Sequence, residues 1–482
     1  MKTSLKIGYG VGQGADGIKT AAFSTFLFFY YNQVLGLSGS LAGMAALLAL
    51  VVDAITDPMI GQISDRFNSR WGRRHPFMLA GAIPFAAAMI ALFSPPSGLS
   101  EMALFFWMLS WAIAVRLMLT LFFVPHLSLG AEMVRDYHER TKLIGYRVFF
   151  SYAGVLVTTV LGFALFFPST DMYQNGMLNA DSYASFGAFV GLMGMTVMLI
   201  SVISTRSVIP SLSKAVHDPL AKSAFFGFVA VFVTLKEHAF RILFLATLMF
   251  MIVAGVSQTL LLYVSSYIFE FTSNHLAILS SSIIFSIFLA PMVAQRLSAK
   301  IDKKNTLAVC AFAGGLIAAF PFFLYFLDLF QPLSISSRLT IVFIGNAIAQ
   351  SFFIAYIIML DSMLSDTIDV HEQHTAKREE GLFFAARSLA TKASFGLGSF
   401  FAGVALDIIN FPKNTLPADM PAAAVNNLAI LAGPVLLALF MITIVISSRY
   451  PLTSSSHREV LRVIAINKQQ LDVKFRAAQE MS

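Results

Sequence analysis

The chain contains apolar stretches of about 20 residues that recur along its whole length. A helix of this length crosses the hydrocarbon core of a bilayer and satisfies its backbone polar groups internally. The stretches are continuous rather than alternating, which excludes a membrane β-barrel. We expect twelve membrane helices, at about residues 14–36, 41–63, 75–95, 101–130, 144–167, 184–209, 240–268, 276–298, 305–328, 335–361, 381–409 and 425–448.

The composition agrees with a membrane protein, since 57% of the residues are hydrophobic and only 12% are charged. Most of the 33 Lys and Arg residues fall in loops on the side of the N-terminus, whereas the opposite loops hold only Arg338 and Lys413. The positive-inside rule therefore predicts cytoplasmic termini and a multi-pass protein of the plasma membrane, in a bacterium the inner membrane. The net charge of +7 is spread over short loops, so we expect no nucleic-acid partner.

A polar segment between the sixth and seventh expected helices divides the chain into two halves. This layout is typical of secondary transporters built from two repeats. The predicted fold is an all-α membrane protein with two pseudo-symmetric six-helix halves. We expect an N-terminal half at 1–209, a central cytoplasmic loop at 210–238, a C-terminal half at 239–448 and a cytoplasmic amphipathic tail at 449–482.

Two acids, Asp53 and Asp57, interrupt the second apolar stretch. A charged side chain at the bilayer centre costs about 2.5–3.5 kcal/mol, so intramembrane acids face the bundle interior and usually mark an ion or substrate pathway. Their spacing places both on one helix face, one turn apart, where they could hold a single cation. The alternative is that they only pair with basic residues and hold helices together.

The loop after this helix reads Gly61-x3-Asp65-Arg66-x5-Gly72-Arg73-Arg74. It resembles the signature between the second and third helices of the major facilitator superfamily, with a longer spacer. The resemblance implies the major facilitator fold and an inner gate that ion pairs hold closed. The loop after the eighth expected helix resembles this loop weakly, and the fifth and eleventh expected helices begin alike. These similarities fall at corresponding positions of the two halves. The expected gating residues are Asp65, Arg66, Gly72, Arg73, Arg74, Glu139, Arg140, Asp302 and Glu380.

The longer spacer indicates a narrower family. The runs Asp53-Ala-Ile-Thr-Asp57-Pro58-x-x-Gly61 and Ser69-Arg70-Trp71-Gly72-Arg73 resemble the melibiose permease branch, the glycoside-pentoside-hexuronide:cation symporters. The resemblance covers nearly the whole chain and is strongest over residues 6–150. It implies cation-coupled transport by alternating access, with no enzymatic activity and no cofactor besides the coupling ion.

The same resemblance implies a cation site. In that family the two acids of the second helix bind the cation, and Asp53 and Asp57 match them. Thr120 matches a threonine that lines the site, and Thr56 stands where the melibiose permeases have Asn. Sodium takes about six hard oxygens, whereas a proton needs one carboxylate, so both Na⁺ and H⁺ stay open.

The expected substrate site departs from that of the melibiose permeases. Gly17 and Phe123 occupy the positions of their sugar-binding acids, so we do not expect galactoside specificity. Bases in or near the helices need either acids, as in an Asp16–Lys19 pair, or an acidic ligand such as a hexuronide. The candidate substrate residues are Asp16, Gly17, Lys19, Arg116, Phe123, Arg147 and Lys392.

Two cytoplasmic segments carry further expectations. The acids and histidines at 366–374 are assigned to a short solvated loop, with Glu379 or Glu380 pairing Arg140 across the two halves. In the tail, Ser456-x-x-Glu459 is interpreted as a capping box that starts an amphipathic helix.

Three functional classes compete. A cation-coupled symporter of a small polar solute, such as a sugar or glycoside, accounts for the two halves, the gate motif and the paired acids. A sodium-dependent lysolipid carrier of the same branch fits the arrival of Phe123 in place of a sugar-binding acid. An intramembrane prenyl transferase would need a second acidic motif at membrane depth, and Asp361, Asp366 and Asp369 are expected too near the cytoplasmic loop to supply it. We therefore expect a symporter that acts as a monomer in the lipid bilayer and holds no resident metal.

Overall fold

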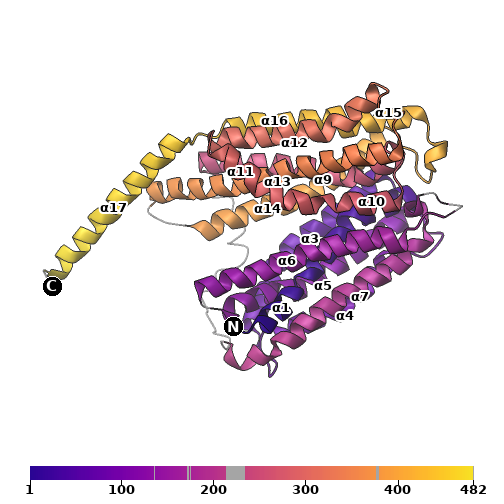
Figure 1. Ribbon diagram of the computed structural model, residues 1–482. Helices are drawn as coiled ribbons and strands as arrows, with labels where there is room; N and C mark the ends of the chain where they lie inside the picture. The colour runs from indigo at the N-terminus through magenta and orange to yellow at the C-terminus, as the bar shows by residue number, and fades with distance from the viewer. Residues whose placement is uncertain (135, 171–172, 174, 213–233, 376–378, 481–482) are drawn as a thin grey trace.

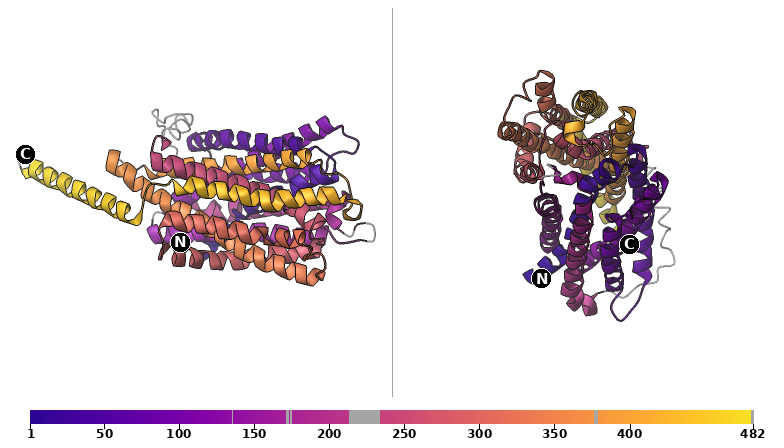
Figure 2. Two further views of the ribbon diagram at one scale, coloured as in Figure 1. Left: turned by 90° about the horizontal axis from the view of Figure 1, so that it is seen from above. Right: turned by 90° about the vertical axis from the view of Figure 1, so that its right-hand side faces the viewer.

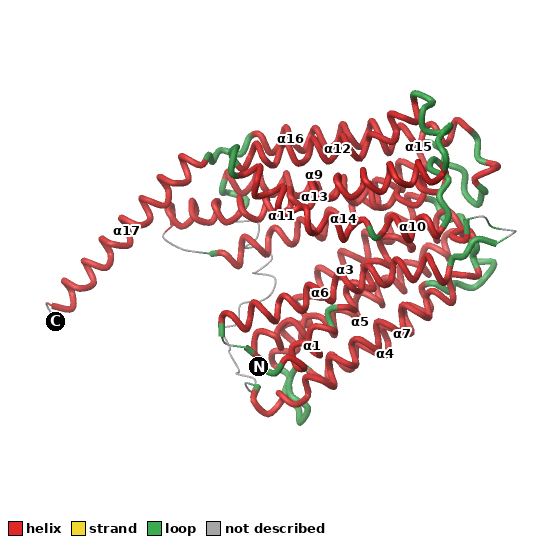
Figure 3. The backbone as a smooth tube through the Cα atoms, viewed as in Figure 1, coloured by secondary structure: helices red, strands yellow, loops and turns green. Residues whose placement is uncertain are grey.

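The computed structural model describes residues 1–134, 136–170, 173, 175–212, 234–375 and 379–480. All regular structure in this part of the chain is helical, without any strand (Figure 3). Eleven of the described helices are long and apolar enough to cross a bilayer. The prediction of an all-α membrane protein is thereby confirmed.

The first expected span is built from short pieces rather than from one long helix. α1 (Thr3–Val11) and α2 (Gly14–Ala21) are followed by two π-helical segments, η1 (Ala22–Leu27) and η2 (Tyr30–Val34). Glycine lowers helix propensity, and Gly12 stands between the first two pieces. Widened π-helical turns are frequent at functional sites, so this span is a natural place for ligand contacts.

The other N-terminal helices follow the predicted spans. They are α3 (Gly39–Arg66), α4 (His75–Leu92), α5 (Glu101–Met133), α6 (Tyr137–Leu161) with the π-helical η3 (Gly162–Phe166), and α7 (Asp181–Thr205). The short 3₁₀ helices η4 (Gly176–Leu178) and η5 (Arg206–Ser211) flank α7. Most of the expected central loop, 210–238, lies outside the described residues.

The C-terminal helices also follow the predicted order. They are α9 (His238–Tyr267), α10 (Ser273–Ser280), α11 (Ser282–Ser298), α12 (Lys303–Phe326), α13 (Ile335–Thr375), α14 (Glu380–Ile408), the 3₁₀ helix η6 (Pro417–Asp419), α15 (Ala422–Ile430), the π-helical η7 (Leu431–Val435) and α16 (Leu436–Ser448). The last helix, α17 (Ser454–Glu480), projects from the bundle in Figures 1 and 2.

The prediction that residues 366–374 form a loop is wrong, because α13 continues to Thr375. Met363, Leu364 and Ile368 are buried on one side of this extension. The extension is therefore amphipathic, and a search for continuous apolar stretches stops at its first acid, Asp361. Among the described residues no cluster of His, Cys, Asp and Glu could hold a metal ion.

The capping box of the tail lies three residues before the expected one. The backbone N–H of Ser456 donates to Thr453 Oγ1 at 3.3 Å, and the N–H of Thr453 donates to Ser456 Oγ at 2.8 Å. This reciprocal pair starts α17 at Ser454, and Glu459 takes no part in it.

The two groups of helices lie side by side and diverge toward the end that carries the N-terminus (Figure 1). α3 of the first group packs along α14 of the second, and α6 contacts α10. Gly39 and Gly403 let α3 and α14 approach closely, since a Cβ on either would meet the backbone oxygen of the other. The groups are therefore in direct contact at the end remote from the N-terminus.

Polar contacts reinforce this end. The Asp407 carboxylate accepts hydrogen bonds from the backbone N–H groups of Gly39 at 2.9 Å and Ser40 at 2.7 Å. The Tyr263 hydroxyl donates to Asn32 Oδ1 at 2.5 Å. Two different pairs of helices are thus tied together across the boundary between the groups.

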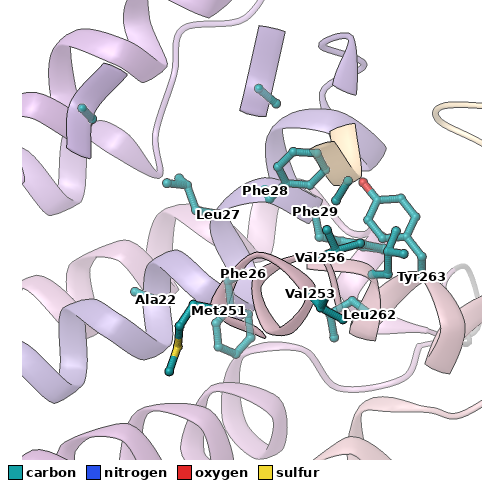
Figure 4. Close-up of a cluster of buried hydrophobic side chains, with 14 of the residues drawn as sticks. Ala22, Phe26, Leu27, Phe28, Phe29, Met251, Val253, Val256, Leu262 and Tyr263 are labelled. Atoms are coloured by element: carbon teal, nitrogen blue, oxygen red, sulfur yellow. The ribbon is translucent and has the colours of Figure 1, made fainter. Parts of the chain in front are cut away.

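A buried aromatic cluster joins the first span to α9 (Figure 4). The rings of Phe29 and Tyr263 meet edge to face, with centroids 5.0 Å apart. Phe26 and Met251 are buried beside the same interface. Aromatic pairs of this kind stabilise an interface beyond the area they bury.

Candidate functional site

The two intramembrane acids face a matching pair of residues on α5. Asp53 and Asp57 lie one turn apart on α3, and Arg116 and Thr120 lie one turn apart on α5. The Thr120 hydroxyl lies 3.0 Å from Asp53 Oδ1 and 2.8 Å from Asp57 Oδ1. A hydroxyl has one proton, so it donates to one carboxylate at a time. Thr120 therefore bridges the two acids.

Arg116, a candidate substrate residue, also contacts this cluster. Its Nη1 lies 3.2 Å from Asp53 Oδ2, and the side chains are 12% and 15% exposed. The guanidinium lies 5.3 Å from the centroid of the Phe23 ring, on η1. Sequence analysis missed the contact, although the spacing of Arg116 and Thr120 equals that of the two acids.

Thr56 contributes little to the acid pair. Its hydroxyl donates to the backbone carbonyl of Asp53 at 3.3 Å and is thereby engaged within its own helix. Of the four residues expected to bind the cation, the side chains of Asp53, Asp57 and Thr120 meet one another.

The other candidate substrate residues are dispersed. Lys19 Nζ lies 3.4 Å from Asp16 Oδ1, as in the expected pair, and Arg147 Nε donates to Gln13 Oε1 at 3.2 Å. Gly17 packs against the backbone of α6, where a Cβ would clash. Phe123 is half-buried against the hydrophobic core. The side chain of Lys392 lies outside the described residues.

The gate motif forms a compact ion-pair network. Arg74 contacts Asp65 Oδ1 at 2.5 Å and Glu132 Oε1 at 2.9 Å, and Arg73 contacts the same Glu132 oxygen at 2.8 Å. Gly72 has a φ of +76°, a conformation that favours glycine and turns the chain between the acid and the arginines. Arg66 is exposed. Sequence analysis missed Glu132, which lies at the far end of α5.

Of the remaining gating candidates, Glu139 contacts its own half. Glu139 pairs with Lys6 at 2.6 Å and Lys142 at 3.2 Å, and these hydrogen bonds lower the pKa of Glu139 to about 2. Arg140 and Glu380 are exposed. Glu379 Oε2 lies 3.2 Å from His371 Nε2, so this acid is engaged without the expected partner Arg140.

Asp302, another gating candidate, contacts the tail of the chain. Its Oδ1 accepts hydrogen bonds from the Ser454 hydroxyl at 2.6 Å and the Ser454 backbone N–H at 3.1 Å. These bonds lower the pKa of Asp302 below its usual value. The residue therefore anchors the start of α17.

A cavity of about 530 Å³ lies between the two groups of helices. Ser24, Thr25 and Thr159 line it from the N-terminal group, while Gln258 and Gln350 line it from the other. Most of the lining is apolar, and it contains no charged side chain among the described residues. The acid pair, Arg116 and Thr120 lie outside this lining.

Comparisons with known proteins agree with this architecture. A family model described as "MFS/sugar transport protein" matches residues 8–454. The chain is 24% identical to an uncharacterized symporter of Synechocystis sp., over 97% of both chains. It is 25% identical to a putative glycoside/cation symporter of Escherichia coli, over 98% of this chain and 95% of the relative. A bacterial homolog of the human lysosomal transporter Spinster superposes with a TM-score of 0.65 at 16% identity, covering 95% of this chain and 97% of that chain.

Proposed function

Because the chain belongs to the MFS/sugar transport protein family, we propose that it is a cation-coupled symporter, driven by Na⁺ or H⁺, of a sugar or glycoside. The observation that carries this proposal is the pair Asp53 and Asp57, bridged by Thr120 inside the helical bundle. Acids at membrane depth are costly and mark ion pathways. The protein is a membrane transporter rather than an enzyme.

Alternating access supplies the mechanism. The cation site lies within the N-terminal half, whereas the cavity is lined by both halves. Rocking of one half against the other changes the side to which such a central site opens. Binding of ion and solute is then coupled reciprocally, each raising the affinity for the other by the same factor. We assign the halves to 1–209 and 239–448 and the gate to the Asp65–Arg74–Glu132 network.

The cavity supports a neutral solute over an acidic one. Its polar groups are hydroxyls and amides, which hydrogen-bond to sugar hydroxyls without favouring charge. Lys19 is paired with Asp16, and Arg116 with Asp53, so these bases have acids of their own. A carboxylate-bearing sugar would find no basic side chain among the described residues that line the cavity.

The amphiphile carrier remains the second candidate, because most of the cavity lining is apolar. Phe163, Phe250 and Phe322 all contribute to it. An acyl chain would bury against such a surface. Uptake of labelled lysolipid, compared with labelled neutral glycoside and glucuronide, separates these alternatives.

The orientation follows from the basic loops. We propose that both termini are cytoplasmic, in a bacterial inner membrane, and that the protein acts as a monomer. The end at which the two halves are tied by Asp407 and Tyr263 is then the outer end.

Transport into proteoliposomes tests the proposed function. An imposed Na⁺ or H⁺ gradient should drive accumulation of a neutral glycoside, and Asp57→Asn should reduce it to the level of protein-free liposomes. Asp419→Asn, at an exposed acid of η6, is the matched control and should retain wild-type uptake. Full gradient-driven uptake by Asp57→Asn would refute the assignment of the cation site.

A further inference from the structure

We propose that the guanidinium of Arg116 is the resident cation of the Asp53–Asp57 site, so that the native protein binds no sodium there. This inference rests on the cation site named in the proposed function and specifies which ion it excludes. It treats Arg116 as a specificity-determining residue rather than as part of the substrate site.

The contacts of Asp53 carry the argument. Its Oδ2 faces Arg116 Nη1 at 3.2 Å, and its Oδ1 faces the Thr120 hydroxyl at 3.0 Å. Asp53 therefore has one oxygen held by a cation and the other beside the hydroxyl that it shares with Asp57. Sodium needs about six hard oxygen ligands and would have to gather them around a carboxylate that the guanidinium already occupies.

The chemistry of arginine makes the exclusion strong. A guanidinium has five N–H donors and no acceptor, so Arg116 cannot serve as a ligand to a metal ion. It also stays protonated in proteins, so its positive charge repels a second cation at this distance. Two carboxylates and one guanidinium leave the cluster with one negative charge rather than two.

Burial keeps Arg116 in place. Its side chain is 12% exposed and is held against the Phe23 ring. Its Nε is buried and makes no hydrogen bond within the described part of the chain. Separating a buried charge from its partner is costly, so Arg116 stays with Asp53.

A second intramembrane pair provides a matched comparison. Arg387 Nε on α14 lies 2.9 Å from Asp361 Oδ1 on α13. Neutralising Arg387 exposes one carboxylate, whereas neutralising Arg116 exposes a pair that Thr120 bridges. Only the second change should create a site with enough oxygens for sodium.

The test is thermal stability of the purified full-length protein, titrated with NaCl against choline chloride. Wild type should show no sodium-specific stabilisation, whereas Arg116→Gln should show a saturable one. Arg116→Lys, which keeps the charge, and Arg387→Gln should behave like wild type. The double variant Arg116→Gln/Asp57→Asn should lose the effect.

Two results would overturn the inference: a sodium-specific rise in wild type, or a folded Arg116→Gln protein without one. If Arg116→Gln does not fold, equilibrium binding of radioactive sodium to wild type and Arg116→Lys decides, since saturable binding to either contradicts the proposal and its absence supports it. These measurements need no substrate. Sodium-driven uptake by wild type would leave the proposed symport intact and refute only the role of Arg116. Absent uptake together with a sodium response in Arg116→Gln would refute the proposed symport and leave the role of Arg116 intact.

Discussion

Glu139 shows how single side chains organise the end of the bundle that carries the N-terminus. Its carboxylate forms ion pairs with Lys6, with Lys142 and, at 3.4 Å, with the N-terminal amine. One side chain therefore ties α1 to the start of α6. These contacts depend on the ionised acid, and the pKa of Glu139 is lowered to about 2.

The stabilisation from Glu139 should therefore depend on pH in one direction. A depressed folded-state pKa stabilises the protein fully above the ordinary value of 4.5, and this is lost as pH falls toward about 2. The melting temperature of Glu139→Gln should be lower than that of wild type by a constant amount between pH 5 and about 8, and the gap should narrow below. Glu459→Gln on exposed α17 is the control, and a gap that widens on acidification contradicts the assignment.

Part of the site could be predicted from the sequence at the scale of single residues. Helical spacing predicts that Asp53 and Asp57 share a face, but it does not give the rotation of α5 relative to α3. That rotation decides whether Arg116 meets an acid or a solute, and it depends on packing along the whole helix. Glu132 was missed for the same reason, since its partner Arg74 lies 58 residues away in the sequence.

Among the elements, α17 depends on a contact from another helix. Asp302 precedes α12 as its N-cap but makes no side-chain bond there, and it caps the first turn of α17 instead. Apolar stretches predict the membrane helices well because lipid imposes one length and one composition. They do not locate amphipathic ends such as the last turns of α13, which buried one-sided contacts stabilise.

Asp302→Ala should loosen the first turn of α17. Loss of a capping acceptor lowers the local stability of the first helical turn. Hydrogen exchange at the backbone N–H of Ser454 should accelerate accordingly, while α12 stays protected. Asp419→Ala, at the exposed acid of η6, is the control. Unchanged exchange at Ser454 would show that His457, 3.0 Å from Asp369, suffices to hold the helix.

At the scale of the whole molecule, the close approach of α3 and α14 holds the two groups of helices together at the end remote from the N-terminus. Gly39 and Gly403 have no room for side chains, and Asp407 caps the start of α3 beside them. The two-half layout could be predicted from the sequence, because the spans and the central polar segment divide evenly. The arrangement of the two groups relative to each other could not be predicted, since it depends on contacts between residues more than 360 positions apart.

Gly403→Val should shift the molecule away from this arrangement, because its side chain would collide with the Gly39 backbone. Spin labels at positions 101 and 413, in a Cys310→Ser background, should report longer distances than in the parent. Gly145→Val, where nothing lies within 4 Å of the added Cβ, should leave them unchanged. An unaltered distribution in Gly403→Val would mean that the contact does not control closure.

The amides in the cavity bear on stereochemistry. A primary amide carries a donor and an acceptor on one planar group, so Gln258 can meet an axial or an equatorial hydroxyl by turning over, while Gln350, whose Nε2 donates to Asn346 Oδ1 at 3.1 Å, keeps its carbonyl oxygen as an acceptor. A fixed carboxylate only accepts hydrogen bonds and therefore favours one orientation of a sugar hydroxyl. We therefore expect epimers to compete on nearly equal terms here, with selection falling on the size of the ring system and the hydroxyls it carries.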